Sequence, residues 1–236
     1  MLTSRLVTTL GGDKFRDEYS IHFDDDNGDF ISFTETLFSV HDTAYSFSFW
    51  CKRDAISNFD IIFGNDAHAN YDFIIFDTDG DRLMLEGLQD GNTATAACST
   101  VANTWYHFVV VSNGDNSHLM YQDGVELDPV SDDLTMNRDI KFDTIGGSSG
   151  NTFNGNISDV AIYNTALTEI QVKELYNSRE PFDHKSGSAS GNLIHWWRMG
   201  DGTENGAGTT VYDLVGSLDG TMTNMDATDY EGDVPS

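Results

Sequence analysis

Short runs in which apolar and polar residues alternate dominate the first two thirds of the chain. In residues 45–52 (YSFSFWCK), every second side chain is aromatic or a thiol, and these side chains share one face. Alternation over about four to eight residues is typical of a half-buried β-strand. Further strands are expected at residues 59–63, 73–76, 82–86, 93–99, 106–111, 119–122 and 141–145. The pattern therefore predicts a chain built mostly of strands.

Two turns with strong local signals separate some of these strands. Residues 19–23 and 30–33 are also expected to be strands, and the acidic segment 24–29 (DDDNGD) lies between them. This arrangement predicts a hairpin that closes at the acidic turn. A second hairpin is expected at Asp79-Gly80, because Asp-Gly favours the tight turns that join antiparallel strands.

One late segment carries a different signal. A strand is expected from Phe153, with apolar positions up to Ile162. Thr168 then occupies a helix N-cap position and Gln171 follows three residues later, which is the capping-box spacing. The prediction is one short helix at residues 168–177. A strand-rich chain with a single helix indicates an all-β domain and argues against an α/β enzyme.

Three segments resemble a known family. Residues 145–177 (IGGSSGNTFNGNISDVAIYNTALTEIQVKELYN) resemble the signature of laminin-G-like, concanavalin-A-like jelly rolls. Residues 105–111 (WYHFVVV), followed by 121–124 (YQDG), resemble a hairpin of that family. Residues 193–202 (LIHWWRMGDG) and 211–224 (VYDLVGSLDGTMTN) resemble its closing strand pair. The segments occur in family order.

The resemblance implies an antiparallel jelly-roll β-sandwich of two sheets, with one short helix near residues 168–177. It covers most of residues 18–224, which we expect to form one domain. Residues 1–17 are polar and unpatterned and are expected to form an N-terminal arm. Residues 225–236 are expected to form a short acidic C-terminal tail. Because one fold hosts many functions, this assignment does not give the function.

The charge of the chain limits its partners. Lys and Arg together number 12 against 39 Asp and Glu, a formal net charge of −27. Such a chain repels phosphate backbones and anionic membrane surfaces, so we expect no nucleic-acid binding. No apolar run has the length of a membrane span or a signal peptide, and no membrane insertion is expected. Cys51 and Cys98 lie in strand-like segments and are expected to be buried free thiols.

The acidic segment is the first candidate metal site. Calcium prefers several oxygen ligands, which a turn rich in Asp and Asn can supply. The spacing does not match the EF-hand loop. Jelly rolls of the family that the chain resembles often hold calcium at the rim of the sandwich, which makes Asp24, Asp26 and Asp29 the candidate ligands. The alternative is an exposed acidic turn without a metal.

Glycan binding is the second candidate chemistry. It requires exposed aromatic side chains that stack on sugar faces, and Asp or Asn side chains that hold hydroxyls. The candidate residues are Trp50, Asp66, His68, Asn70, Tyr71 and Trp197. Trp196 and Trp197 are adjacent in an expected strand and face opposite ways, so one of them should lie on an exposed surface. The alternative for each tryptophan is a place in the core.

A glycoside hydrolase is the least favoured function. Concanavalin-A-like glucanases use an E-x-D-x-x-E strand motif, and the closest string here is residues 126–131 (ELDPVS). Serine stands at its third acidic position, and Pro129 is unfavourable inside a central strand. We therefore expect no catalytic site and no enzymatic activity.

The leading hypothesis is a non-catalytic structural protein of a tailed-phage virion, such as a capsid decoration or fibre-associated subunit. It would be made in the host cytoplasm and lie on the virion surface, with residues 1–17 docked on other virion proteins. The alternative is a calcium-assisted carbohydrate-binding module, located outside the cell, that binds host or environmental glycans. A homo-oligomer is compatible with the sequence but not indicated by it.

Overall fold

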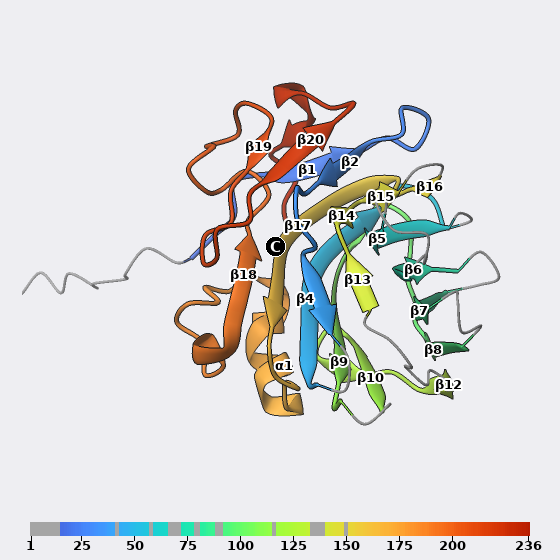
Figure 1. The fold of residues 1–236 in the computed structure, drawn as a ribbon. Coiled ribbons are helices and arrows are strands. Elements are labelled where there is room, and N and C mark those ends of the chain that lie inside the picture. The colour runs from blue at the N-terminus through green and yellow to red at the C-terminus, as the bar shows by residue number, and fades with distance from the viewer. Residues whose placement is uncertain are drawn as a thin grey trace, which may run out of the picture.

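The computed structural model describes residues 15–40, 43–56, 59–65, 72–77, 81–87, 92–114, 117–132, 140–148 and 151–236. Within these residues, two antiparallel sheets pack face to face as a β-sandwich, and one α-helix lies on the outside (Figure 1). The predicted all-β jelly-roll fold is thus confirmed. No helix among the described residues is long and apolar enough to cross a bilayer.

The two sheets take up nearly all of the strands. The eight-stranded sheet runs in the order β11 (Val125–Glu126), β10 (His118–Gln122), β9 (Trp105–Ser112), β4 (Tyr45–Arg53), β17 (Gly155–Tyr163), β1 (Ser20–Phe23) and β21 (Tyr230–Glu231), with β18 (Leu193–Trp197) also paired to β17. The nine-stranded sheet runs in the order β12 (Pro129–Asp132), β8 (Asn92–Ala97), β7 (Arg82–Gly87), β6 (Asp72–Phe76), β5 (Asp60–Gly64), β14 (Thr144–Ile145), β2 (Phe30–Ser32), β20 (Gly220–Thr223) and β19 (Thr210–Val211).

Smaller elements complete the chain. Two short ribbons pair β3 (Phe38–Val40) with β13 (Ile140–Phe142) and β15 (Gly147–Ser148) with β16 (Asn151–Thr152). The α-helix is α1 (Glu169–Tyr176), and single 3₁₀ turns lie at Asn177–Arg179, Ser190–Asn192 and Ala227–Asp229. In both main sheets the paired strands are antiparallel.

The main core lies between the two sheets. As the alternation predicts, Phe47, Phe49 and Cys51 of β4 point into it. They meet aromatic side chains of the opposite sheet, and the rings of Phe47 and Phe63 are 5.0 Å apart. Cys51 and Cys98 are both buried and free. Close packing of large rings between sheets is a major stabilising contribution in a sandwich of this kind.

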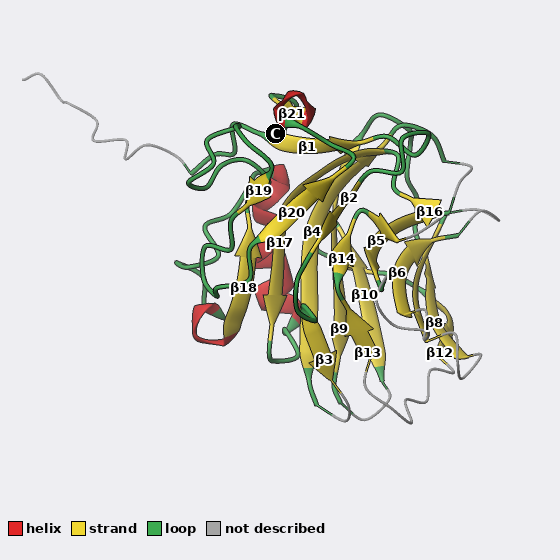
Figure 2. Cartoon of the chain, turned by 45° about the horizontal axis from the view of Figure 1, so that its top comes forward, coloured by secondary structure: helices red, strands yellow, loops and turns green. Residues whose placement is uncertain are grey.

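A second apolar layer covers the outer face of the eight-stranded sheet. Here α1 and the loop 178–192 pack on the side of the sheet that faces away from the nine-stranded sheet (Figure 2). Tyr163, Trp196 and Val172 belong to this layer and are buried. The sheet that carries β4 and β17 is therefore covered on both faces.

The predicted helix is confirmed with its cap. The Thr168 backbone N–H donates to Gln171 Oε1 over 2.9 Å, and the Gln171 N–H donates to Thr168 Oγ1 over 3.3 Å. These two bonds are the capping box expected from the spacing. Leu167 before the cap and Val172 inside the helix are buried in the same apolar cluster, which fixes the direction in which the chain enters α1.

The predicted hairpin around the acidic turn is wrong. Strand β1 pairs with β17 and β21, whereas β2 pairs with β14 and β20. The acidic residues 24–29 therefore carry the chain from one sheet to the other. Local alternation shows that both segments are strands, but it does not select the sheet to which each strand belongs.

Both ends of the described chain belong to the sandwich. Phe15 stacks on Trp196, and Asp17 is buried and lies 2.7 Å from the Arg198 guanidinium. Residues 15–17 are thus part of the fold rather than of a separate arm, and residues 1–14 lie outside the described residues. The acidic C-terminal segment 225–236 also contacts the sandwich, because β21 pairs with β1 and Asp233 accepts a hydrogen bond from Trp105 Nε1 over 2.8 Å.

Candidate functional site

The acidic turn is held by its own carboxylates. Asp24 Oδ1 accepts the Asp26 N–H, and Asp24 Oδ2 accepts Asn27 Nδ2, each over 3.0 Å. Asp29 is 2% exposed, and its Oδ2 accepts the Asp24 N–H over 3.0 Å. Side chains of Asp bond to nearby backbone in this way in many turns. The turn is therefore organised by hydrogen bonds between its own residues.

The predicted calcium ligands are only partly brought together. Carboxylate oxygens of Asp24, Asp25 and Asp26 can lie within 4.8 Å of one another. Asp29 is not in this group and contributes to the turn instead. Exposed acidic groups of this kind are common without a metal, so calcium binding by Asp24 and Asp26 stays a prediction.

Neither predicted tryptophan is available to a ligand. Trp50 is 1% exposed and stacks on Tyr176 of α1, and Trp197 is fully buried in the core between the sheets. Trp196, its neighbour, is also buried, beneath Phe15 and beside His184. The expectation that one of the two adjacent tryptophans is exposed is wrong, because the second apolar layer covers the outer face as well.

The other predicted glycan-binding residues fall in one loop. Asp66, His68, Asn70 and Tyr71 lie outside the described residues. This part of the predicted site stays a prediction.

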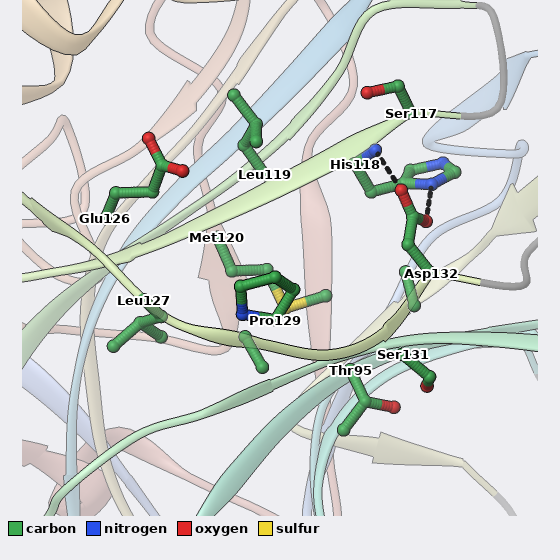
Figure 3. Close-up of a pocket in the computed structure, with 12 residues that line it drawn as sticks. Thr95, Ser117, His118, Leu119, Met120, Glu126, Leu127, Pro129, Ser131 and Asp132 are labelled. Atoms are coloured by element: carbon green, nitrogen blue, oxygen red, sulfur yellow. Dashed lines mark hydrogen bonds and ion pairs between the residues drawn. The ribbon is translucent and has the colours of Figure 1, made fainter.

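A cleft opens where the ends of the two sheets meet. Strands β10 and β11 end one sheet, β12 ends the other, and a cavity of about 170 Å³ lies between them (Figure 3). We call it the edge cleft; its lining residues are Ala94, Thr95, Ala96, Ser117, His118, Leu119, Met120, Glu126, Leu127, Pro129, Ser131 and Asp132. It thus combines apolar surface with hydroxyl, imidazole and carboxylate groups.

One end of the edge cleft is fixed by a pair of contacts between the sheets. Asp132 Oδ1 lies 2.9 Å from His118 Nδ1, and Asp132 Oδ2 accepts the His118 backbone N–H over 3.1 Å (Figure 3). The His118 side chain is 1% exposed, whereas that of Asp132 is 30% exposed. A residue of β12 thereby caps the edge of β10. These contacts hold the Asp132 carboxylate in one orientation at the wall of the cleft.

The charged groups of the edge cleft are acidic. Glu126 is exposed, and Figure 3 shows it beside Leu119, at the end opposite Asp132. Within the described part of the chain, no Lys or Arg lines the cleft. Its chemistry is therefore that of a site for hydroxyl groups or for a cation.

Local patterns in the sequence do not indicate this site. Residues 126–131 match a strand motif of hydrolases only in part, and His118 has no histidine or cysteine beside it at metal-ligand spacing. The cleft forms because residues 127–132 cross from one sheet to the other, with the Leu127 N–H bonded to the Met120 carbonyl and β12 paired to β8. This crossing is a long-range property that no local spacing encodes. Pro129, an expected breaker of central strands, was the one local signal of an edge strand.

Comparison with protein families found one match. The family described as the concanavalin A-like lectin/glucanases superfamily matches residues 25–173, which include most of both sheets. A comparison with curated protein sequences found no match.

Solved structures share the fold at low sequence identity. A candidate carbohydrate-binding protein from Bacteroides ovatus is 19% identical with a TM-score of 0.65, covering 89% of this chain. The chain spans only 59% of that longer protein. A heptameric SAP-like pentraxin from Limulus polyphemus is also 19% identical, with a TM-score of 0.53, and the match covers 68% of this chain and 82% of the pentraxin. At such identities the likeness concerns the fold alone.

Proposed function

Since the chain belongs to the concanavalin A-like lectin/glucanases superfamily, we propose that it binds carbohydrate without cleaving it, and that the edge cleft is the binding site. The observation that carries the proposal is the mixed lining of this cleft at an accessible end of the sandwich. The structural likeness to a candidate carbohydrate-binding protein agrees with the same class of function.

The lining suits the two kinds of surface that a sugar ring offers. Met120, Leu127 and Pro129 supply apolar surface for the C–H groups of a ring, and Thr95 and Ser131 supply hydroxyls for its polar rim. Binding pockets commonly combine apolar walls with a few placed polar groups in this way. The cavity of about 170 Å³ suits a single sugar unit or the end of a chain better than a large ligand.

Binding without hydrolysis is supported by the carboxylates. Retaining glycosidases need two carboxyl groups about 5–5.5 Å apart, with one free to attack the sugar. Figure 3 shows Glu126 and Asp132 at opposite ends of the cleft, and both oxygens of Asp132 contact His118. This arrangement favours holding a ligand over cleaving it.

A glycan array with the purified chain tests the proposal. Reproducible binding is expected, and mass spectrometry should recover the bound glycan uncleaved. The array is run in calcium and again in EDTA. Binding that is lost in EDTA would add the acidic turn to the site, whereas silence in both conditions would contradict the proposed function.

Substitutions at two neighbouring residues test whether the edge cleft is the binding site. Ser131→Phe puts a bulky ring on a residue that lines the edge cleft, and we expect binding to be lost. Val130→Phe adds the same ring one residue earlier on β12, at a half-exposed position outside the lining, and should leave binding unchanged. Equal effects of the two substitutions would rule out the cleft as the site.

No contact among the described residues favours the virion-associated role, which stays a prediction from the sequence. It is compatible with glycan binding, since a particle protein can also adsorb to polysaccharide. Deletion of residues 1–14 tests it, because attachment to the particle should then be lost.

A further inference from the structure

We propose that the edge cleft prefers glycans that carry a free amino group over neutral ones, and that it rejects glycans that carry a carboxylate. This inference rests on the proposed function and adds the class of sugar that the site takes. Its basis is the position and the environment of the two carboxylates that line the cleft.

The cleft has two acidic groups, and the one imidazole among its lining residues, that of His118, is already bonded to Asp132. Glu126 and Asp132 line it, and among the described residues no Lys or Arg side chain does. A sugar carboxylate placed beside either carboxylate would meet a like charge and no Lys or Arg among the described residues. A sugar ammonium in the same place would meet an opposite charge. Like charges brought together disfavour binding, and opposite charges favour it.

Asp132 keeps capacity to accept further hydrogen bonds. An ionised carboxylate has about four lone-pair sites, and the contacts with His118 use one on each oxygen. Its side chain is 30% exposed, so water or a ligand can reach the remaining sites. An ammonium group offers three donors and no acceptor, which complements this carboxylate. Because the contacts with His118 already fix the orientation of this carboxylate, little conformational entropy is lost when a ligand binds.

Glu126 supplies a second, exposed charge at the other end of the cleft. It is exposed and is not paired with any Lys or Arg in the described contacts. Hydrogen bonds of sugar hydroxyls to Thr95 and Ser131 would remain common to amino and neutral glycans.

The charge of the whole molecule acts in the same direction. With a net charge of −27, the chain attracts cationic ligands and repels anionic ones before contact. This long-range attraction is not specific to the cleft. The experiment must therefore separate the field of the whole chain from the effect of the lining residues.

The test measures the affinity of β-1,4-linked trimers of glucosamine, glucose and glucuronic acid by isothermal titration calorimetry. All three are measured at about pH 6, where a sugar amine carries its proton. We expect the glucosamine trimer to bind about fivefold more tightly than the glucose trimer, the size typical of a partly exposed ion pair. The glucuronic acid trimer should bind the weakest of the three.

Two matched substitutions separate the cleft from the overall charge. Glu126→Gln removes one negative charge from the lining and should reduce the ratio of glucosamine to glucose affinity. Asp128→Asn removes one negative charge from an exposed residue two positions away, outside the lining, and should leave that ratio unchanged.

The outcomes distinguish this inference from the proposed function. Equal affinity for the glucosamine and glucose trimers, or no binding of the glucosamine trimer, would overturn the preference for amines. An equal fall of the ratio in both variants would overturn it too, because the bulk charge would then explain the effect. Carbohydrate binding itself is contradicted by a glycan array without any binding, an outcome that differs from each of these.

Discussion

His107 is a titratable side chain enclosed in the outer apolar layer. It is buried, lies 2.9 Å from the Ser48 hydroxyl, and its ring packs 5.0 Å from that of Trp50. Burial, assisted by the neighbouring His184, lowers the pKa of His107 to about 3. The imidazole is therefore neutral in the folded protein above pH about 3.

This histidine should make the fold less stable in mild acid. Between pH about 6.5 and about 3, the unfolded chain binds a proton at this position and the folded chain does not, so stability falls as the pH falls. Urea unfolding at pH 7 and pH 5 measures the change, and His107→Gln should make it smaller.

The carboxyl group of Asp60 has the opposite effect on the pH dependence of stability, so the His107→Gln variant must be compared with the unchanged chain. Burial raises the pKa of Asp60 to about 6 despite the adjacent Arg53, so protonation of Asp60 favours the fold in the same range. The comparison of His107→Gln with the unchanged chain cancels this contribution. An identical pH dependence in both proteins would contradict the role of His107.

Asp159 connects the sandwich to its outer layer. It lies at a bulge of β17 with a φ of 51°, and its carboxylate accepts Trp196 Nε1 over 2.6 Å. Its other oxygen lies 3.1 Å from His184 Nε2, and His184 Nδ1 lies 2.5 Å from the Tyr163 hydroxyl. The bulge turns this side chain towards the outer layer, where its hydrogen bonds hold the loop 178–192.

Removal of the Asp159 charge should loosen that loop. Burial alone would raise the pKa of Asp159, but the charge and hydrogen bond of His184 lower it below the usual value. Its stabilising contribution is thus present above pH about 4 and is lost as the pH falls through the lower, folded-state pKa. We expect Asp159→Asn to cost about 3 kcal/mol in urea unfolding at pH 7. A loss no larger than that of the exposed-site variant Asp128→Asn would contradict this account.

At the scale of elements, the start of β17 requires glycine. Gly155 has a φ of 136°, and a Cβ at this position would clash with the Lys52 carbonyl of the neighbouring strand β4. Gly155→Ala should therefore cost about 3 kcal/mol or more, from backbone strain and steric overlap together. Gly191→Ala is the matched control, because no atom lies within 4 Å of its added Cβ. Thermal unfolding of both variants checks this, and similar melting temperatures would be inconsistent with it.

Local sequence patterns predicted the helix and the strands. Long-range packing decides which other elements each of them contacts. The helix was predictable because the capping box between Thr168 and Gln171 is a local signal. The strand at 45–52 was predictable because its apolar and polar side chains alternate, and that at 106–111 because it is a short run rich in valine and aromatic residues. The separation of β1 and β2 into different sheets was not, since alternation is the same for a hairpin and for a crossing. The sequence leaves both an exposed and a buried position open for Trp50. The buried one is found because a second layer, formed more than 100 residues later in the sequence, covers it.

At the scale of the whole molecule, the excess of negative charge favours the binding of divalent cations. Thermal unfolding in the presence of calcium therefore tests the candidate metal site. If Asp24 and Asp26 bind calcium, 10 mM calcium should raise the melting temperature by about 5 °C relative to EDTA, given a Kd of about 0.1 mM. Asp26→Asn should remove the increase, and Asp128→Asn should retain it. A melting temperature that calcium does not change would count against the metal site.

A glycan bound at the edge cleft can be located directly. Backbone amide chemical shifts are recorded by NMR while a glycan from the array is titrated. The largest shifts are expected in β8, in β10 and in residues 126–132. Largest shifts in the acidic residues 24–29 or in the loop 178–192, with the edge cleft unchanged, would contradict binding at the cleft.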